Sequence, residues 1–173
     1  KSNIYSNWTF VKHRPAKFTS FVYGLDFGYN HPTALVRVYW RDKDLYIEPV
    51  IYESYLTTTD LIARMDQLGI EKSINILADY SRPEIIAEID RAGYYIENAN
   101  KEASKVQTEG LPDTQGTIKV LAGSNKPYKD FIQQVKDGTG YAQIDGKDIL
   151  GAYIYSITRD NKMTAANYGM ISY

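Results

Sequence analysis

One aspartate, Asp26, most constrains what this chain can fold into, because it ends an apolar run typical of a buried β-strand. The run Phe21-Val22-Tyr23 leads into it, and a glycine lies two residues away on either side. A second apolar run, residues 34–40, follows a turn marked by Asn30-His31-Pro32, so the two runs predict a β-hairpin. A carboxylate inside such a strand is costly to bury unless it is paired or bound to a metal ion. Asp26 is therefore a candidate metal ligand.

A second aspartate, Asp79, has a similar setting at the end of the apolar run of residues 74–78. Two carboxylates that each end a strand suggest a site for divalent metal ions, which prefer carboxylate oxygens. Each acid also has a simpler interpretation. Asp26 can be a turn or capping acid of the hairpin, and Asp79 can cap the helix that follows it.

Composition narrows the class of protein. The chain has 173 residues, enough for one domain with a core, and its 43% hydrophobic and 24% charged residues are ordinary for a soluble globular protein. It has no cysteine, which excludes a disulfide framework, a thiol nucleophile and a zinc–thiolate site. No apolar run is long enough to span a membrane, and the first residues lack a signal-peptide pattern. With a net charge of −1, any binding to nucleic acid has to use a local basic patch.

The order of predicted elements indicates an α/β fold. Three antiparallel strands come first, and Pro49 in the third predicts an edge strand or a bulge there. Strands and helices then alternate, which argues for parallel strands joined by crossovers. The predicted strands are residues 20–26, 33–40, 45–52, 74–78, 94–96, 117–121 and 152–158, and the predicted helices are residues 57–69, a helix opened by residues 81–84, residues 127–136 and residues 161–171.

Two motifs resemble the C-terminal nuclease domain of tailed-bacteriophage large terminase subunits. Residues 24–29 match the family pattern G-L-D-x-G-Y, and residues 78–83, which open a helix, resemble its A-D-S-A-E-P. The similarity covers most of the chain. It implies an RNase H-like mixed sheet, made of an antiparallel meander plus parallel strands and flanked by helices. It also implies that residues 1–20 are a linker or first strand from an upstream ATPase domain, and that residues 21–173 are the nuclease domain.

The sequence departs from the family at its third motif, N-H-x-x-D-A-x-R-Y-G. Asn161 replaces the histidine, Thr164 the acid and Asn167 the arginine, and Arg82 replaces a glutamate in the second motif. Asp160 lies four residues before Thr164, so the two share one face of a helix and Asp160 is the candidate third ligand.

Three alternatives for this position stay open. Asp160 can instead cap the last helix. Asp145 and Asp148 are weaker candidates for the third ligand. The metal site can also be weakened or inactive.

The resemblance implies hydrolysis of phosphodiesters with two divalent ions, Mg²⁺ or Mn²⁺, held roughly 3.5–4 Å apart. In this scheme Asp26 bridges both ions, Asp79 holds one, and Asp160 holds the other. Lys101 and Lys105 fall where the family tends to carry lysine, and they are candidate contacts to DNA phosphates. Their simpler interpretation is that of solvated loop lysines.

The function implied is cleavage of double-stranded DNA, with little sequence preference, during genome packaging in the host cell cytoplasm. The implied partners are the upstream ATPase domain, the small terminase subunit and the portal protein, with no membrane. Two other classes remain open. One is a nucleic-acid-binding relative with a degraded metal site. The other is a different RNase H-like enzyme, such as a resolvase, an integrase-type recombinase or an actin-like phosphotransferase.

Overall fold

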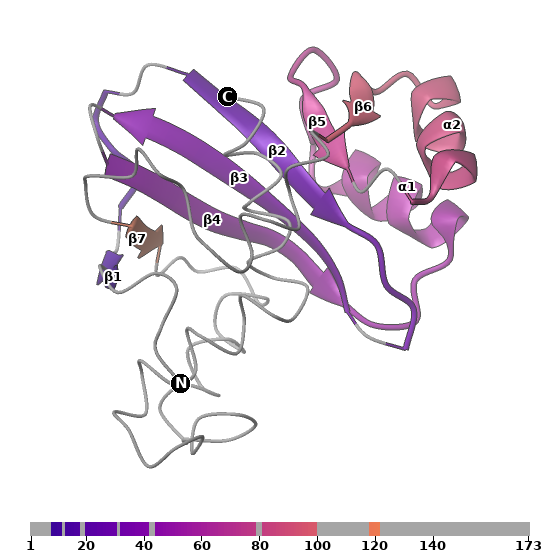
Figure 1. Ribbon diagram of the computed structural model, residues 1–173, viewed down its shortest axis with the longest axis horizontal. Coiled ribbons are helices and arrows are strands. Elements are labelled where there is room, and N and C mark those ends of the chain that lie inside the picture. Colours follow the sequence, from indigo (N-terminus) through magenta and orange to yellow (C-terminus); the bar gives the residue numbers. More distant parts are fainter. Residues whose placement is uncertain are drawn as a thin grey trace.

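A mixed β-sheet forms the centre of the computed structural model (Figure 1). The structure describes residues 8–11, 13–17, 20–30, 32–41, 44–78, 81–99 and 118–121. Within these residues the sheet has seven strands in the order β1-β7-β4-β3-β2-β5-β6. The elements are β1 (Trp8–Val11), β2 (Ser20–Asp26), β3 (Thr33–Arg41), β4 (Asp44–Glu53), α1 (Thr58–Gln67), β5 (Ile76–Ala78), α2 (Pro83–Arg91), β6 (Ile96–Asn98) and β7 (Ile118–Leu121).

The predicted antiparallel meander is confirmed in strands β2, β3 and β4. β2 pairs with β3 from Ser20↔Trp40 to Asp26↔Ala34, and β3 pairs with β4 along its length. The β3–β4 register shifts between Leu35 and Val36, where an extra residue, Val50, enters β4 directly after Pro49. The proline therefore marks a bulge, one of the two outcomes that its position in the strand predicts.

The parallel half of the sheet is also confirmed. β5 pairs parallel with β2 and with β6, and α2 connects β5 to β6. Both strands begin two residues later than predicted. Ile74 still donates its amide to the Glu71 carbonyl (3.3 Å), and Tyr94 donates to the Ile89 carbonyl at the end of α2 (3.4 Å). These turns use the backbone groups that an earlier strand start would need.

The strand predicted at residues 117–121 appears as β7, at Ile118–Leu121. It runs parallel to both of its neighbours, β4 and β1. Trp8–Val11, which lies within the predicted linker or first strand, therefore extends the sheet as β1. The helices predicted over residues 127–136 and 161–171, and the strand predicted over residues 152–158, lie outside the described residues.

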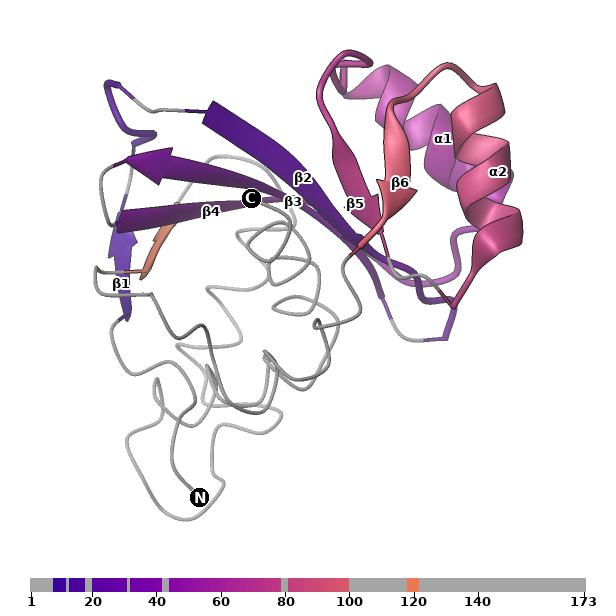
Figure 2. The same cartoon turned by 45° about the horizontal axis from the view of Figure 1, so that its top comes forward.

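The main core lies between one face of the sheet and the two helices (Figure 2). Leu61 and Met65 of α1 and Ile89 of α2 belong to the same buried cluster as Leu25 and Ile76 of the sheet. Side chains alternate between the two faces of a strand, so the residues of different strands that belong to this cluster lie on the same face of the sheet. We call the face that packs against α1 and α2 the helix side of the sheet.

Local signals explain where the helices begin. Thr57 accepts a hydrogen bond from the Asp60 amide (3.1 Å), and the Asp60 carboxylate accepts one from the Thr57 amide (3.1 Å), which together form a capping box. α2 begins with Pro83, a residue suited to a first helical turn. Its N-cap is Arg82, without a side-chain cap, so the cap position does not fall on Asp79. No helix within the described residues is long and apolar enough to cross a membrane.

Candidate metal centre at the carboxyl end of the central strands

Asp26 is the last residue of β2, a central strand of the sheet, and it is buried with 6% of its surface exposed. The side chains of Tyr23 and Leu25 belong to the helix-side core, so alternation directs Asp26 to the opposite face. Val22 is on that face, where it packs in a cluster with Leu77 of β5. The candidate ligand thus lies on the face of the sheet away from α1 and α2.

The register of β2 with β5 bears on the second candidate. Leu25 pairs with Ala78 in a parallel ladder, and both residues belong to the helix-side core. In the sequence, Asp26 follows Leu25 and Asp79 follows Ala78. β5 itself ends at Ala78, and Asp79 lies outside the described residues. Each candidate acid therefore directly follows one member of the Leu25↔Ala78 pair in the sequence.

The chain that leaves Asp26 is held by one side chain. Thr33, the first residue of β3, is 2% exposed. Its hydroxyl donates to the Gly28 carbonyl (2.8 Å) and accepts from the Gly28 amide (3.1 Å). This pair of bonds fixes the connection between β2 and β3 next to Asp26, in place of water that would otherwise bind these groups.

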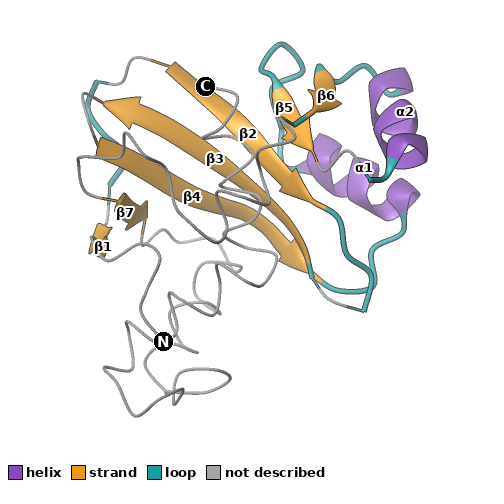
Figure 3. Cartoon of the chain, viewed as in Figure 1, coloured by secondary structure: helices purple, strands orange, loops and turns teal. Residues whose placement is uncertain are grey.

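A second connection, from β4 to α1, lies at the same end of the sheet (Figure 3). The amide of Tyr55 donates to the Tyr29 carbonyl of the β2–β3 connection (2.7 Å). The two rings meet edge to face with centroids 5.7 Å apart. Tyr55 has a φ of 64°, a left-handed conformation that costs a residue with a Cβ atom about 1–2 kcal/mol. Nothing in the sequence indicates that these two tyrosines form a pair.

The helix side of the same strands carries a charged network. Arg37 of β3 donates from Nε to the Tyr23 hydroxyl (2.9 Å), from one terminal nitrogen to Glu48 (3.2 Å), and from the other to Glu71 (3.2 Å). The Tyr23 hydroxyl in turn donates to Glu71. The network joins β2, β3 and β4 with the segment after α1, directly behind the strands that lead to Asp26.

Burial and these partners shift the pKa of each group. Burial, and then the hydrogen bond to Glu71, raises the pKa of Tyr23 to about 12. Burial by itself raises the pKa of the Glu71 carboxyl, but the hydrogen bonds from Tyr23 and Arg37 outweigh it, and the pKa falls below its ordinary value of 4.5. Burial opposes the charge of Arg37, yet its bond to Tyr23 and the nearby Glu48 raise its pKa. Arg37 and Glu71 are therefore charged, and Tyr23 is neutral, at pH 7.

Arg14 extends the network from the segment between β1 and β2. It donates two hydrogen bonds to Glu48, both 3.1 Å long, and lies over the ring of Tyr39 at 6.0 Å from the centroid. Tyr39 donates to the other oxygen of Glu48 (3.0 Å). Burial, and then the charge of Glu48, raises the pKa of Tyr39.

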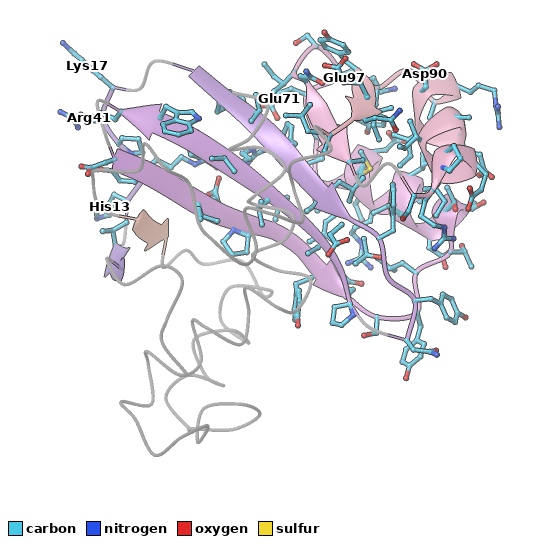
Figure 4. The ribbon with its side chains drawn as sticks, viewed as in Figure 1. His13, Lys17, Arg41, Glu71, Asp90 and Glu97 are labelled. Carbon is cyan, nitrogen blue, oxygen red and sulfur yellow. The ribbon has the colours of Figure 1, made fainter. Side chains whose placement is uncertain are left out.

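Three exposed basic residues, His13, Lys17 and Arg41, lie away from Asp26. Figure 4 shows Lys17 and Arg41 at the end of the sheet opposite the carboxyl end of β2, with His13 near β1. All three side chains are exposed. They do not form part of the candidate metal centre.

Among the predicted site residues, the structure describes Asp26. Asp79, Asp160, Lys101 and Lys105 lie outside the described residues, as do Asp145 and Asp148. The described residues contain no group of three His, Asp or Glu side chains that could hold a metal ion. Asp26 fits a divalent metal by its donor chemistry, because a buried carboxylate offers the oxygen ligands that Mg²⁺ and Mn²⁺ prefer.

Comparison with known proteins defines the class of fold. No protein family matches the chain as a whole or in part, and no curated protein matches its sequence. The strands in the order β4-β3-β2-β5-β6, together with the two helices, form an RNase H-like fold, which solved structures share.

More particularly, the fold is that of large terminase nuclease domains. The nuclease domain of bacteriophage SPP1, in a structure with bound Mn, superposes with a TM-score of 0.63 at 20% identity, over 96% of this chain and 96% of that chain. The nuclease domain of phage P22 gives a TM-score of 0.59 at 15% identity, over 98% and 91%. The large terminase of a thermophilic bacteriophage gives 0.60 at 14% identity, over 94% of this chain and 42% of that chain. The resemblance seen in the sequence is confirmed at the level of fold.

Proposed function

We propose that this chain is a divalent-metal-dependent endonuclease that cuts double-stranded DNA during phage genome packaging. The observation that carries the proposal is the position of Asp26. It is a buried carboxylate at the carboxyl end of a central strand, next to the Leu25↔Ala78 pair after which Asp79 follows in sequence. The fold shared with the nuclease domains of SPP1 and P22 supports the same function.

The proposed ligands are Asp26, Asp79 and Asp160. Leu25 and Ala78 are partners in parallel strands and lie on the same face of the sheet. Since side chains alternate along a strand, Asp26 and Asp79 are proposed to share the opposite face and to form one site. Divalent ions bound by such carboxylates activate water and stabilise the leaving oxygen of a phosphodiester. Mn bound in the SPP1 structure supports Mn²⁺ or Mg²⁺ as the cofactor. Lys101 and Lys105 are proposed to bind phosphates of the substrate.

Neighbouring residues would hold Asp26 in place for such a site. The strand fixes the backbone of Asp26 through its pairing with Ala34, and the Thr33–Gly28 bonds hold the chain that follows it. A ligand held in this way is preorganised, so metal binding does not have to order it. Gly24, two residues earlier on the same face, carries no side chain that would compete for that space.

The partners proposed are double-stranded DNA, an upstream ATPase domain, the small terminase subunit and the portal protein, in the cytoplasm of the host. The large terminase of the thermophilic phage, of which this chain matches 42%, supports a longer protein around the nuclease. With a net charge of −1, the chain is expected to bind DNA weakly, because phosphate neutralisation by lysine and arginine drives nonspecific affinity.

Plasmid cleavage tests the proposal. The wild-type chain should nick or linearise plasmid with Mn²⁺ or Mg²⁺ and should be inactive with EDTA. Asp26→Asn and Asp79→Asn should lose cleavage, whereas Asp90→Asn, an exposed aspartate on α2, should cut like the wild type. Asp160→Asn tests the third ligand in the same assay.

Metal binding gives a second readout that does not depend on turnover. Mn²⁺ at about 100 times its dissociation constant should stabilise the wild type by about 2.7 kcal/mol, seen as a higher midpoint of thermal unfolding. Asp26→Asn should lose that shift. A folded wild type that binds Mn²⁺ but cuts no DNA would favour a DNA-binding relative with a degraded site, and no Mn²⁺ binding would refute the metal centre.

A further inference from the structure

Two exposed tyrosines lie at the end of the sheet that carries Asp26. Tyr29 is 55% exposed and follows Asp26 by three residues, and Tyr55 is 65% exposed in the connection from β4 to α1. Their connections leave the carboxyl ends of β2 and β4, which meet at one end of the sheet (Figure 3). The backbone bond from the Tyr55 amide to the Tyr29 carbonyl ties the two segments together (2.7 Å).

Packing in the core does not account for the pair, because both rings are exposed. Large aromatic side chains are normally buried because each removes a large apolar area from water. Here both rings are held edge to face at 5.7 Å while remaining open to solvent. Tyr55 also keeps a φ of 64°, which a residue with a Cβ atom adopts only at a cost, and such conformations cluster at functional sites. At residue 55 an unfavourable backbone conformation thus carries an exposed aromatic ring.

The two connections that carry the pair have no acidic side chain of their own. Residues 27–32 and 54–57, which form the two connections, contain no Asp or Glu, and the nearby Asp60 in the first turn of α1 accepts a hydrogen bond from the Thr57 amide. The acid at the end of β4, Glu53, is paired with Arg64 of α1. A DNA strand can therefore approach both rings without meeting an unpaired carboxylate among these residues, although the chain as a whole has a net charge of −1.

We propose that Tyr29 and Tyr55 form an aromatic contact for the DNA strand next to the scissile phosphate, stacking on an accessible base or deoxyribose. The inference rests on the proposed function, because the position of the strand follows from a phosphodiester bound at Asp26. Stacking is tolerant of sequence, since every base has an aromatic face. The contact would hold the strand beside the metal centre without selecting where it is cut.

The variant Tyr55→Asn tests the ring of residue 55 separately from its backbone conformation. Asparagine tolerates the left-handed conformation of residue 55, so the backbone bond to Tyr29 should persist while the ring is lost. The second variant is Tyr29→Ser, which keeps the carbonyl that accepts this bond. The control is Tyr95→Ser, whose side chain is 52% exposed but precedes β6, at the amino end of the parallel strands rather than the carboxyl end.

The assay is fluorescence anisotropy of a short labelled duplex with a frayed end, titrated with the 173-residue chain in Ca²⁺ or EDTA so that nothing is cut. Loss of one stacked base should weaken binding roughly 5- to 150-fold for Tyr55→Asn and Tyr29→Ser. Tyr95→Ser and the ring-retaining Tyr55→Phe should bind like the wild type. The midpoint of thermal unfolding should stay within a few degrees of the wild type in every variant.

Two results would overturn this contact without refuting the proposed function. Wild-type affinity in both ring-deleting variants, with an active wild-type nuclease, refutes the contact and leaves the proposed function intact. A large drop in the unfolding midpoint of Tyr55→Asn would show that the ring is part of the fold. A wild-type chain that neither binds nor cuts DNA is a different result, because it refutes the proposed function and this contact with it.

Discussion

Arg37→Met should destabilise the chain by about 3–5 kcal/mol, because it leaves a largely buried carboxylate, Glu48, with one of its partners missing. The side chains of Arg37 and Glu48 are only 14% and 12% exposed. Methionine keeps the length and packing of the arginine stem, so the change removes the charge and its hydrogen bonds more than the contacts of the aliphatic part.

The magnitude follows from the three contacts of Arg37. Its bond to Glu48 (3.2 Å) joins two largely buried charges and contributes roughly 1.5–3 kcal/mol. Its bond to the Tyr23 hydroxyl (2.9 Å) and the position of its guanidinium 5.3 Å from the ring centroid add about 1–2 kcal/mol. The contact with Glu71 is worth at most about 1 kcal/mol, since that side chain is 43% exposed.

A double-mutant cycle in urea tests this reasoning. Arg37→Met, Glu48→Met and the double variant should show a coupling of about 1–3 kcal/mol, with the double variant less destabilised than the two single losses predict. Arg82→Met is the control, because its pair with Glu84 is exposed on both sides (49% and 61%) and should contribute under about 1 kcal/mol. Single changes that add within about 0.5 kcal/mol would refute the claim that the buried pair acts as a unit.

Three further predictions concern the same strands and helices. Thr57→Ala removes one half of the capping box and should cost about 1 kcal/mol, or about 2–4 °C in the midpoint of thermal unfolding, and an unchanged midpoint would contradict the role of the cap. Thr33→Val leaves both polar groups of Gly28 without their partner and should cost about 1–3 kcal/mol, with faster hydrogen exchange at the Gly28 amide; equal exchange in both proteins would argue against the role of the Thr33–Gly28 bonds. Because the pKa of Glu71 is lowered, its carboxylate stabilises the fold at pH values above the ordinary pKa of 4.5, and this stability is lost as the pH falls through the folded-state pKa. Glu71→Gln should therefore flatten the acid limb of a plot of stability against pH, and an unchanged limb would count against the network.

Much of the fold could be predicted from local pattern. The apolar runs before and after Asp26 predicted the β2–β3 hairpin, and Pro49 predicted an edge strand or a bulge in β4, of which the bulge is observed. The threonines at residues 57–59 and Pro83 predicted where α1 and α2 begin, and the structure shows that Thr57 is the threonine that caps α1. The starts of β5 and β6 were wrong by two residues, because the turns around Ile74 and Tyr94 use backbone bonds that a pattern of side chains does not report.

Less of the candidate site could be predicted. The sequence selected Asp26 from its glycine-flanked strand, and the structure places it buried at the end of a central strand. The proposed roles of Asp79, Asp160, Lys101 and Lys105 remain predictions. The Tyr29–Tyr55 pair could not be found from sequence, since residues 26 positions apart meet only because the connections after β2 and β4 leave the same end of the sheet.

The sequence by itself determined the elements, the polarity of their faces and the identity of one candidate ligand, because these depend on spacing along the chain. Only the tertiary structure decided which elements are neighbours. It set β5 beside β2 in the register Leu25↔Ala78, and it gathered Tyr23, Arg37, Glu48 and Glu71 into one network. Pairing between distant strands depends on the burial of a shared core and on hydrogen bonds between them, and neither is a property of any single segment.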